Sequence, residues 1–313
     1  MNIKQLIYGM STFLPGLSHF HSKGTGGTDS ARYCYSVWLR HLVMAERQAL
    51  LTSPKLVVGE LGPGDSIGIG LAALLSGATR YYGMDVVRHA SLNTNIRVLD
   101  DLVTMFKDRE NIPGDEEFPN IKPQLDSYEF PTQILNDEIL ENSLTQERID
   151  RIRSSLENCD TPVSMIKYVA PWFGDNIIER ETIDMIFSQA VLEHIDDLSG
   201  AYQAMRSWLK PTGFVSHVID FKSHGLSSAW NGHWAFSALT WTLMRGRRPF
   251  LLNRAPYSTH IGLAQKAGFK IIHDKKVLQP SDIRPEQLAT PFINISQEDL
   301  GISSTFMQAV IMK

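Results

Sequence analysis

The sequence predicts an α/β fold with a doubly wound, mostly parallel sheet, and three observations support this class. Short apolar segments alternate with segments of helical pattern from residue 56 towards the end of the chain. A glycine-rich turn at residues 59–66 joins the first apolar segment to a helix. Acidic residues stand at the ends of the first two strands, where sheets of this class bind their ligands.

The expected strands and helices follow one another in regular order. The first strand begins with the apolar run Leu56–Val58, and further strands are expected at Tyr81–Asp85, Ser164–Val169, Ile183–Phe187, Phe214–Asp220, Lys270–Val277 and Ser304–Met312. Helices are expected at Ser30–Leu50, Ile67–Leu75 and Arg88–Arg109. The last two strands lie close together near the end of the chain with no long helix after them, which is typical of a terminal antiparallel pair.

The glycine turn predicts a binding site for a nucleotide-like ligand. Gly62 and Gly64 let the backbone approach a ligand closely, and the helix that follows presents free N–H groups. The dinucleotide fingerprint requires a third glycine where this chain has Ile67, so an NAD-dependent dehydrogenase is not favoured. Glu60 would repel a pyrophosphate and attract a cation, while Asp85 stands where a carboxylate holds ribose hydroxyls. A ribose joined to a cation suggests S-adenosylmethionine.

Three blocks in this order resemble the class I S-adenosylmethionine-dependent methyltransferases. They are Val57–Ser66, Tyr81–Asp85, and Ile183–Ile195 followed by the Pro-x-Gly turn of Leu209–Phe214. The chain also resembles uncharacterised bacterial methyltransferases of the type-11 and type-12 kind. The resemblance implies a Rossmann-like sheet of seven strands, antiparallel at its last strand, with a helical insertion. It also implies S-adenosylmethionine as cofactor.

The resemblance implies a set of cofactor-binding residues near the strand ends, namely Glu60, Gly62, Gly64, Asp85, Ala170 and Ser188. The chain departs from the family pattern in two places: Ser66 replaces the third glycine, and Ala170 stands where an acid often follows strand three. Glu193 and His194 resemble part of a metal site in some quinone-pathway O-methyltransferases, but the further acid of that site is Gln189 here. We therefore expect no metal.

The candidate acceptor pocket lies between the fifth and sixth strands. This stretch contains several tryptophans and the cluster Arg245, Arg247 and Arg248, which suits a sugar-like or phosphorylated acceptor. Core packing and a solvated helix end remain the alternatives. Methylation of a hydroxyl needs a base, and the candidate histidines are His194, His224, His233 and His260. We prefer His224, with His194 as the second catalytic candidate.

Size and composition indicate an ordinary globular enzyme. The 313 residues are 43% hydrophobic with a formal net charge of −4, so there is no basic excess for nucleic-acid binding. Cys34 and Cys159 lack metal-site spacing and are expected to be reduced thiols in a cytoplasmic protein. No transmembrane segment is expected, and a homodimer is left open. A catalytically silent S-adenosylmethionine-binding partner subunit is the alternative to an active O-methyltransferase.

The domain organisation follows from these segments. Residues 1–50 are expected to form an N-terminal helical segment that closes on the cofactor site, with Arg32 or Tyr33 either reaching the cofactor or simply packing. Residues 51–313 form the methyltransferase domain, with an acidic, proline-broken insertion at about 90–160. That insertion is either a cap over the active-site rim or a solvated appendage.

Overall fold

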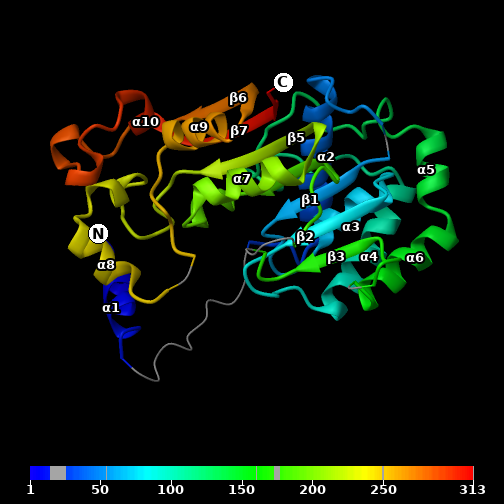
Figure 1. Ribbon diagram of the computed structural model, residues 1–313, viewed down its shortest axis with the longest axis horizontal. Coiled ribbons are helices and arrows are strands. Elements are labelled where there is room, and N and C mark those ends of the chain that lie inside the picture. The colour runs from blue at the N-terminus through cyan, green and yellow to red at the C-terminus, as the bar shows by residue number, and fades with distance from the viewer. Residues whose placement is uncertain (15–25, 54, 160, 173–176, 249, 313) are drawn as a thin grey trace.

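A computed structural model describes residues 1–14, 26–53, 55–159, 161–172, 177–248 and 250–312. In these ranges one sheet has the strand order β3-β2-β1-β4-β5-β7-β6 (Figure 1). The strands are β1 (Val57–Leu61), β2 (Arg80–Met84), β3 (Ile166–Val169), β4 (Ile183–Gln189), β5 (Leu209–Asp220), β6 (Phe269–Leu278) and β7 (Ile302–Ile311). Strand β7 is antiparallel to β5 and β6, and the remaining pairs are parallel. The predicted fold class is confirmed.

One face of the sheet is covered by α2 (Ala31–Arg47), α3 (Gly68–Leu75), α4 (Leu92–Lys107) and α6 (Gln146–Glu157), whose apolar side chains form one core cluster (Figure 1). Helix α2 begins after Ser30, whose hydroxyl accepts the N–H of Tyr33, and its apolar side chains pack inward. Helix α4 begins at Leu92, later than expected, because Ser91 caps it instead.

The other face is covered by α7 (Leu198–Trp208) and α9 (Tyr257–Lys266), which contribute to a second core cluster with strand residues from the same face. Parallel strands buried on both faces explain the apolar runs in the sequence. Strand β5 begins at Leu209, five residues before the expected start at Phe214, because Leu209 pairs with Ile183 across an irregular register.

The acidic stretch expected as an insertion contains an irregular segment, residues 108–136, and the short helix α5 (Asp137–Ser143). Arg40 of α2 anchors the irregular segment: it is buried, and its guanidinium donates to the carbonyls of Pro113 and Pro123 and pairs with Asp115. The segment therefore packs on α2 and is more than a solvated appendage. The expected domain division, including a closing N-terminal segment, stays a prediction.

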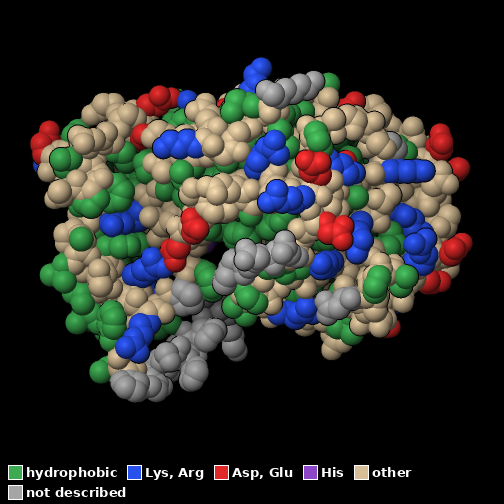
Figure 2. Space-filling view, in the orientation of Figure 1, with side chains coloured by type: hydrophobic (Ala, Val, Ile, Leu, Met, Phe, Trp, Pro, Cys, Tyr) green, Lys and Arg blue, Asp and Glu red, His purple; other side chains and the backbone are tan. Residues whose placement is uncertain are grey.

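Helix α1 (Ile3–Ser11) packs against α8 (Ala238–Arg245), away from the sheet (Figure 1). Hydrophobic side chains are exposed over these two helices, among them Ile3, Ile7, Met10 and Leu239 (Figure 2). Every helix in the described ranges is too short or too polar to span a lipid bilayer.

A cavity of about 220 Å³ lies between α2 and the amino end of β1. Its walls include Trp38, Leu51, Leu56 and Leu135. It is at the edge of the sheet opposite the glycine turn, and none of the predicted site residues lines it.

Candidate active site

The glycine turn follows β1 at the carboxyl edge of the sheet. Gly62 and Gly64 have φ angles of +64° and +76°, which residues with side chains rarely adopt. The N–H of Gly62 donates to the carbonyl of Met84 over 2.8 Å, which ties the turn to the end of β2. A Cβ atom at Gly62 would lie 2.7 Å from Val191. The turn therefore requires glycine at position 62 for both its conformation and its close approach to Val191.

Asp85 follows β2 and supports the glycine turn directly. Its Oδ2 accepts the N–H of Gly64 over 3.2 Å, and its Oδ1 accepts the N–H of Val86 over 2.7 Å. The residue is 5% exposed, and burial raises the pKa of its carboxyl. The N–H of Asp85 donates to Val169, and its carbonyl accepts from Trp172, so Ala170 lies on the segment beside it. The two ends of β2 and β3 thus meet at the glycine turn.

Glu60 lies beneath the turn and does not face it as a free charge. Its carboxyl is 2% exposed and accepts the phenol O–H of Tyr81 over 2.6 Å. Burial raises the pKa of Glu60 to about 8, with the hydrogen bond from Tyr81 opposing the shift. The carboxyl is then mostly protonated at neutral pH, which removes the charge attraction argued from the sequence. A direct role for Glu60 in cofactor binding stays a prediction.

We expect the Glu60→Gln variant to lose the pH dependence of stability that this carboxyl causes. Its pKa in the folded protein, about 8, lies above its unfolded value, so the folded state binds the extra proton between these two values. Stability of the parent should therefore fall as pH rises from about 4.5 to 8, by up to about 1.4 kcal/mol per pH unit. Urea unfolding of both proteins at pH 5 and pH 8 measures this; parallel pH profiles would contradict the assignment.

The first turn of α3 is capped by neighbouring side chains. The N–H of Ser66 donates to Thr28 Oγ1 over 3.1 Å, and Ser66 Oγ accepts the N–H of Gly68 over 3.0 Å. Asn95 of α4 accepts the N–H of Ile67 over 3.0 Å. Ser66, which replaces the family's third glycine, therefore acts as a local cap. Sequence reasoning missed Thr28 and Asn95, because their contacts join segments 28 or more positions apart.

Ser188 lies inside the sheet near the end of β4. Its side chain is fully buried, and its Oγ is 2.8 Å from Nδ1 of His217 on β5. Because the hydroxyl is already hydrogen-bonded within the core, Ser188 would contact the cofactor through its backbone atoms. Beyond it, Gln189 donates to the carbonyl of Lys122 over 3.3 Å, which brings the irregular segment to this edge of the sheet.

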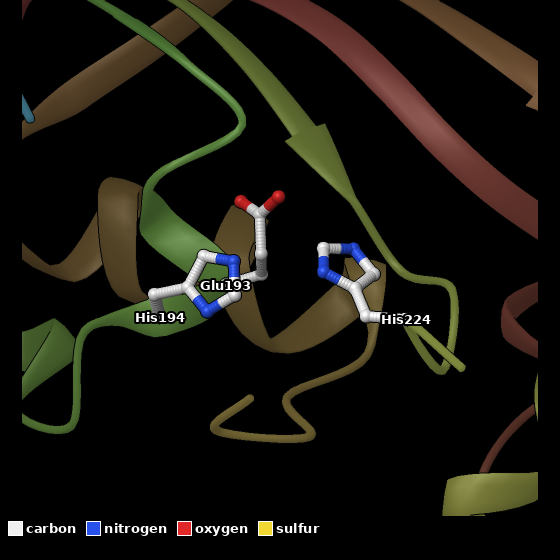
Figure 3. Close-up of side chains that lie close together, drawn as sticks. All are labelled: Glu193, His194 and His224. Carbon is white, nitrogen blue, oxygen red and sulfur yellow. The ribbon is translucent and has the colours of Figure 1, made fainter. Parts of the chain in front are cut away.

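Glu193, His194 and His224 come together just beyond β4 and β5 (Figure 3). Glu193 and His194 are on a short 3₁₀ turn, η1 (Leu192–His194), and His224 follows β5. The rings of His194 and His224 meet edge-on, with 5.2 Å between their centroids and 63° between their planes. His224 Nε2 lies 3.6 Å from Asp220 Oδ2. The two preferred catalytic histidines are thus brought to one place, although 30 positions separate them.

The environment shifts the pKa values of groups in this cluster in different directions. Burial lowers the pKa of His194 to about 4, and the neighbouring His224 adds to the effect, so His194 is neutral at pH 7. Burial raises the pKa of Glu193 well above its ordinary value. Burial acts in the same direction on Asp220, but the contacts with His224 and Lys222 outweigh it and hold that pKa below its ordinary value.

His233 and His260 lie in the core. They are 2% and 0% exposed, and burial lowers the pKa of each to about 3. His260 Nδ1 is 3.3 Å from the hydroxyl of Tyr202. Neither ring reaches solvent, so these two candidates are removed as bases for an incoming acceptor.

The aromatic and basic stretch after β5 is largely structural. Trp230 and Trp234 are buried and donate through their indole N–H groups to the carbonyls of Pro280 and Arg254. They are therefore not available to stack on a sugar ring, which corrects that expectation. Arg245 pairs with Asp196, and Arg248 donates to the side chain of Gln5. Core packing, the alternative left open for the tryptophans, describes Trp230 and Trp234. The internal contacts of Arg245 and Arg248 differ from the solvated helix end that was the alternative for the arginines.

Arg32 and Tyr33 lie at the start of α2. Arg32 pairs with Glu110 and Glu117 of the irregular segment, so the charge of its guanidinium is already neutralised within the protein. Tyr33 packs edge-on against Phe118 with 5.9 Å between ring centroids. Both side chains therefore make contacts within the protein, which is the packing alternative of the sequence analysis.

The strand order, the positive-φ glycine turn and the carboxylate at the end of β2 define a Rossmann-like methyltransferase fold. A family model described as a methyltransferase domain matches residues 138–216, which include β3, β4, η1, α7 and the first part of β5. This match supports the resemblance to class I S-adenosylmethionine-dependent methyltransferases that the sequence motifs indicate. A search of the curated proteins found no match.

Solved structures with a similar fold are distant in sequence. A methyltransferase from Mesorhizobium loti is 14% identical, with 86% of this chain and 97% of that chain covered and a TM-score of 0.43. Phosphoethanolamine N-methyltransferase 2 from Haemonchus contortus, in complex with S-adenosylmethionine, is 14% identical, with coverage of 91% and 57% and a TM-score of 0.44. A methyltransferase from Methanosarcina mazei is 11% identical, with coverage of 83% and 95% and a TM-score of 0.44. These likenesses are too distant to indicate a substrate.

Proposed function

We propose that this methyltransferase transfers the methyl group of S-adenosylmethionine to a hydroxyl of a small-molecule or sugar-like acceptor. The observation that carries the proposal is the pair His194 and His224, which lies beyond the ends of β4 and β5 on the same edge of the sheet as the glycine turn. Val191, which contacts Gly62, is three positions before His194, so the turn and the histidines are connected through η1.

The residues at the ends of β1 and β2 fit the cofactor. The surface beside Gly62 is one that a Cβ atom would fill, and the carboxyl of Asp85 is held at the turn by two backbone N–H groups. We expect Gly62 and Gly64 to pass close to the cofactor, Asp85 to accept its ribose hydroxyls, and Ala170 to line the neighbouring edge. When bound, S-adenosylmethionine supplies a methyl group on a positively charged sulfur, which an acceptor displaces in line.

His224 is the base that we expect to take the proton of the acceptor hydroxyl. Its side chain is 32% exposed, whereas Nδ1 of His194 is already held by the carbonyl of Phe250. Asp220, which stays charged because its pKa is lowered, lies 3.6 Å from His224 Nε2 and would stabilise the protonated ring. The proton then moves from the acceptor oxygen to a ring nitrogen of His224, and His194 bounds the site on the other side.

The alternative of a catalytically silent partner subunit is not supported by the comparisons. A phosphate-bearing acceptor also receives less support than the sequence suggested, because Arg245 and Arg248 are occupied by internal contacts. The proposal therefore centres on uncharged hydroxyl acceptors such as phenols and sugars.

The His224→Ala variant tests the base. A panel of phenols and sugars, with nucleotide sugars included, is first screened with the parent for formation of S-adenosylhomocysteine. For an acceptor that is methylated, His224→Ala should lower kcat by at least about 100-fold while the affinity for S-adenosylhomocysteine stays unchanged. His273→Ala, on the edge strand β6, is the matched control. Turnover retained by His224→Ala would remove His224 as the base.

A further inference from the structure

We propose that Glu193, His194 and His224 bind a divalent transition-metal ion. Within the described ranges, one ligand atom from each of these side chains lies within 4.8 Å of the other two. Two imidazoles and a carboxylate are a ligand set that suits ions such as Zn²⁺, Fe²⁺ and Co²⁺. The sequence suggested that no metal binds, because Gln189 occupies the position of a further acid; the fold supplies His224 as third ligand instead.

The first argument is an unpartnered carboxylate oxygen. Glu193 is 3% exposed, and its Oε1 accepts the N–H of Asp220 over 3.3 Å. Its Oε2 is buried and has no hydrogen-bond partner among the described residues. A buried carboxylate oxygen without a donor is costly, and a cation at this position would remove that cost.

The second argument is the orientation of His194. Its Nδ1 lies 2.9 Å from the carbonyl oxygen of Phe250, which can only accept, so Nδ1 carries the proton. The lone pair is then on Nε2, which is left to bind an ion; a carbonyl behind the ring is the usual arrangement for metal-binding histidines. Asn253 fixes the turn that carries this ring, since its side-chain amide donates to the carbonyls of Leu192 and Ile195.

The third argument concerns His224 and the open side of the cluster. His224 has a φ angle of +44°, an uncommon backbone conformation, and its ring lies 5.2 Å from that of His194 between centroids. Asp220 stands behind it at 3.6 Å, as an outer carboxylate does for many metal-binding histidines. Because His224 is partly exposed, the site is open on one side. Three protein ligands and an open position are typical of a catalytic metal site.

The consequence for catalysis rests on the proposed function. An acceptor hydroxyl bound at the open position would have its pKa lowered by the ion, and its proton would pass to solvent water. The acceptor oxygen then forms its bond to the methyl carbon as the bond from carbon to sulfur breaks. His224 would act as a metal ligand in this case. Its replacement abolishes turnover whether His224 is a base or a ligand, so a measurement of metal binding is needed to distinguish the two roles.

Titration with Co²⁺ tests the site without an acceptor. Tag-free protein freed of metal by a chelator should develop visible Co²⁺ absorption that saturates at one equivalent and is displaced by Zn²⁺. Glu193→Gln, His194→Ala and His224→Ala should each weaken binding by at least about tenfold. Glu147→Gln and His273→Ala, which change the same residue types elsewhere, should bind as the parent. Thermal unfolding shows that each variant is folded. His224→Ala is the variant least prone to unfold, because the side chain of His224 is the most exposed of the three.

Two outcomes would overturn the proposal: no stoichiometric Co²⁺ absorption in the folded parent, or unchanged affinity in all three ligand variants. Its failure is distinguishable from failure of the proposed function. Methyl transfer that persists in chelator-treated protein without Co²⁺ binding removes the metal and leaves the function. Saturable Co²⁺ binding in a protein that does not bind S-adenosylhomocysteine removes the function and leaves the metal site.

Discussion

Replacement of Gly62 by valine is expected to lower the affinity for S-adenosylhomocysteine by at least about 100-fold. The φ angle of +64° is a genuine outlier for a β-branched residue, and the first side-chain carbon would lie 2.7 Å from Val191. The turn would have to open, and it would then lose the hydrogen bond from Gly62 to Met84. Calorimetric titration of the variant beside the parent measures the loss.

Two controls separate the causes of this effect. Gly268→Ala places a side chain at a φ angle of +94° with its nearest contact 3.6 Å away, so it should lose some stability and bind as the parent. The double variant Gly62→Ala with Val191→Ala removes the two closest contacts, at 2.7 and 2.8 Å, so it should bind more tightly than Gly62→Ala alone. If Gly62→Val bound S-adenosylhomocysteine as tightly as the parent, the glycine turn would not be part of the cofactor site.

Replacement of Asp85 by alanine is expected to have an effect of similar size. Its carboxylate holds the N–H groups of Gly64 and Val86 and, in our account, the ribose hydroxyls of the cofactor. Hydrogen bonds to a charged group contribute about 1.5–3 kcal/mol each, so the loss of the ribose contacts should reduce affinity on the order of 100-fold. Titration with S-adenosylhomocysteine measures the change.

Asp101→Asn, an exposed position on α4, is the control for this variant and should bind as the parent. Asp85→Asn is informative as well, because the amide keeps one acceptor oxygen and loses the charge. It should fall between Asp85→Ala and the parent. Equal affinities for Asp85→Ala and the parent, in protein shown to be folded, would place the ribose elsewhere.

The fold was predictable because its signals are local. Apolar runs of strand length, the glycine turn and the helix-starting serines each lie within a few positions, and together they predict the parallel sheet. Boundaries were less predictable: β5 begins at Leu209 because of its pairing with Ile183, which is 26 positions away. The packing of residues 108–136 depends on the buried Arg40, a residue that sequence patterns place on a surface more often than in a core.

The site was predictable in part. Gly62, Gly64 and Asp85 are brought together by the strand–turn–helix order, which the sequence contains. The environment of Glu60 was not, because its protonation depends on burial and on Tyr81, 21 positions away. The choice among the four histidines was not predictable either. His194 and His224 differ from the buried His233 and His260 in exposure, which the sequence does not reveal. These properties arise from contacts between distant segments, which periodicity does not report.

The central claim is that the glycine turn and Asp85 hold S-adenosylmethionine. Calorimetric titration of the purified parent with S-adenosylhomocysteine, with NAD as the control, tests it most directly. We predict saturable binding of S-adenosylhomocysteine at one molecule per chain and no heat of binding with NAD. Absence of S-adenosylhomocysteine binding in folded protein, or saturable binding of NAD, would contradict the account.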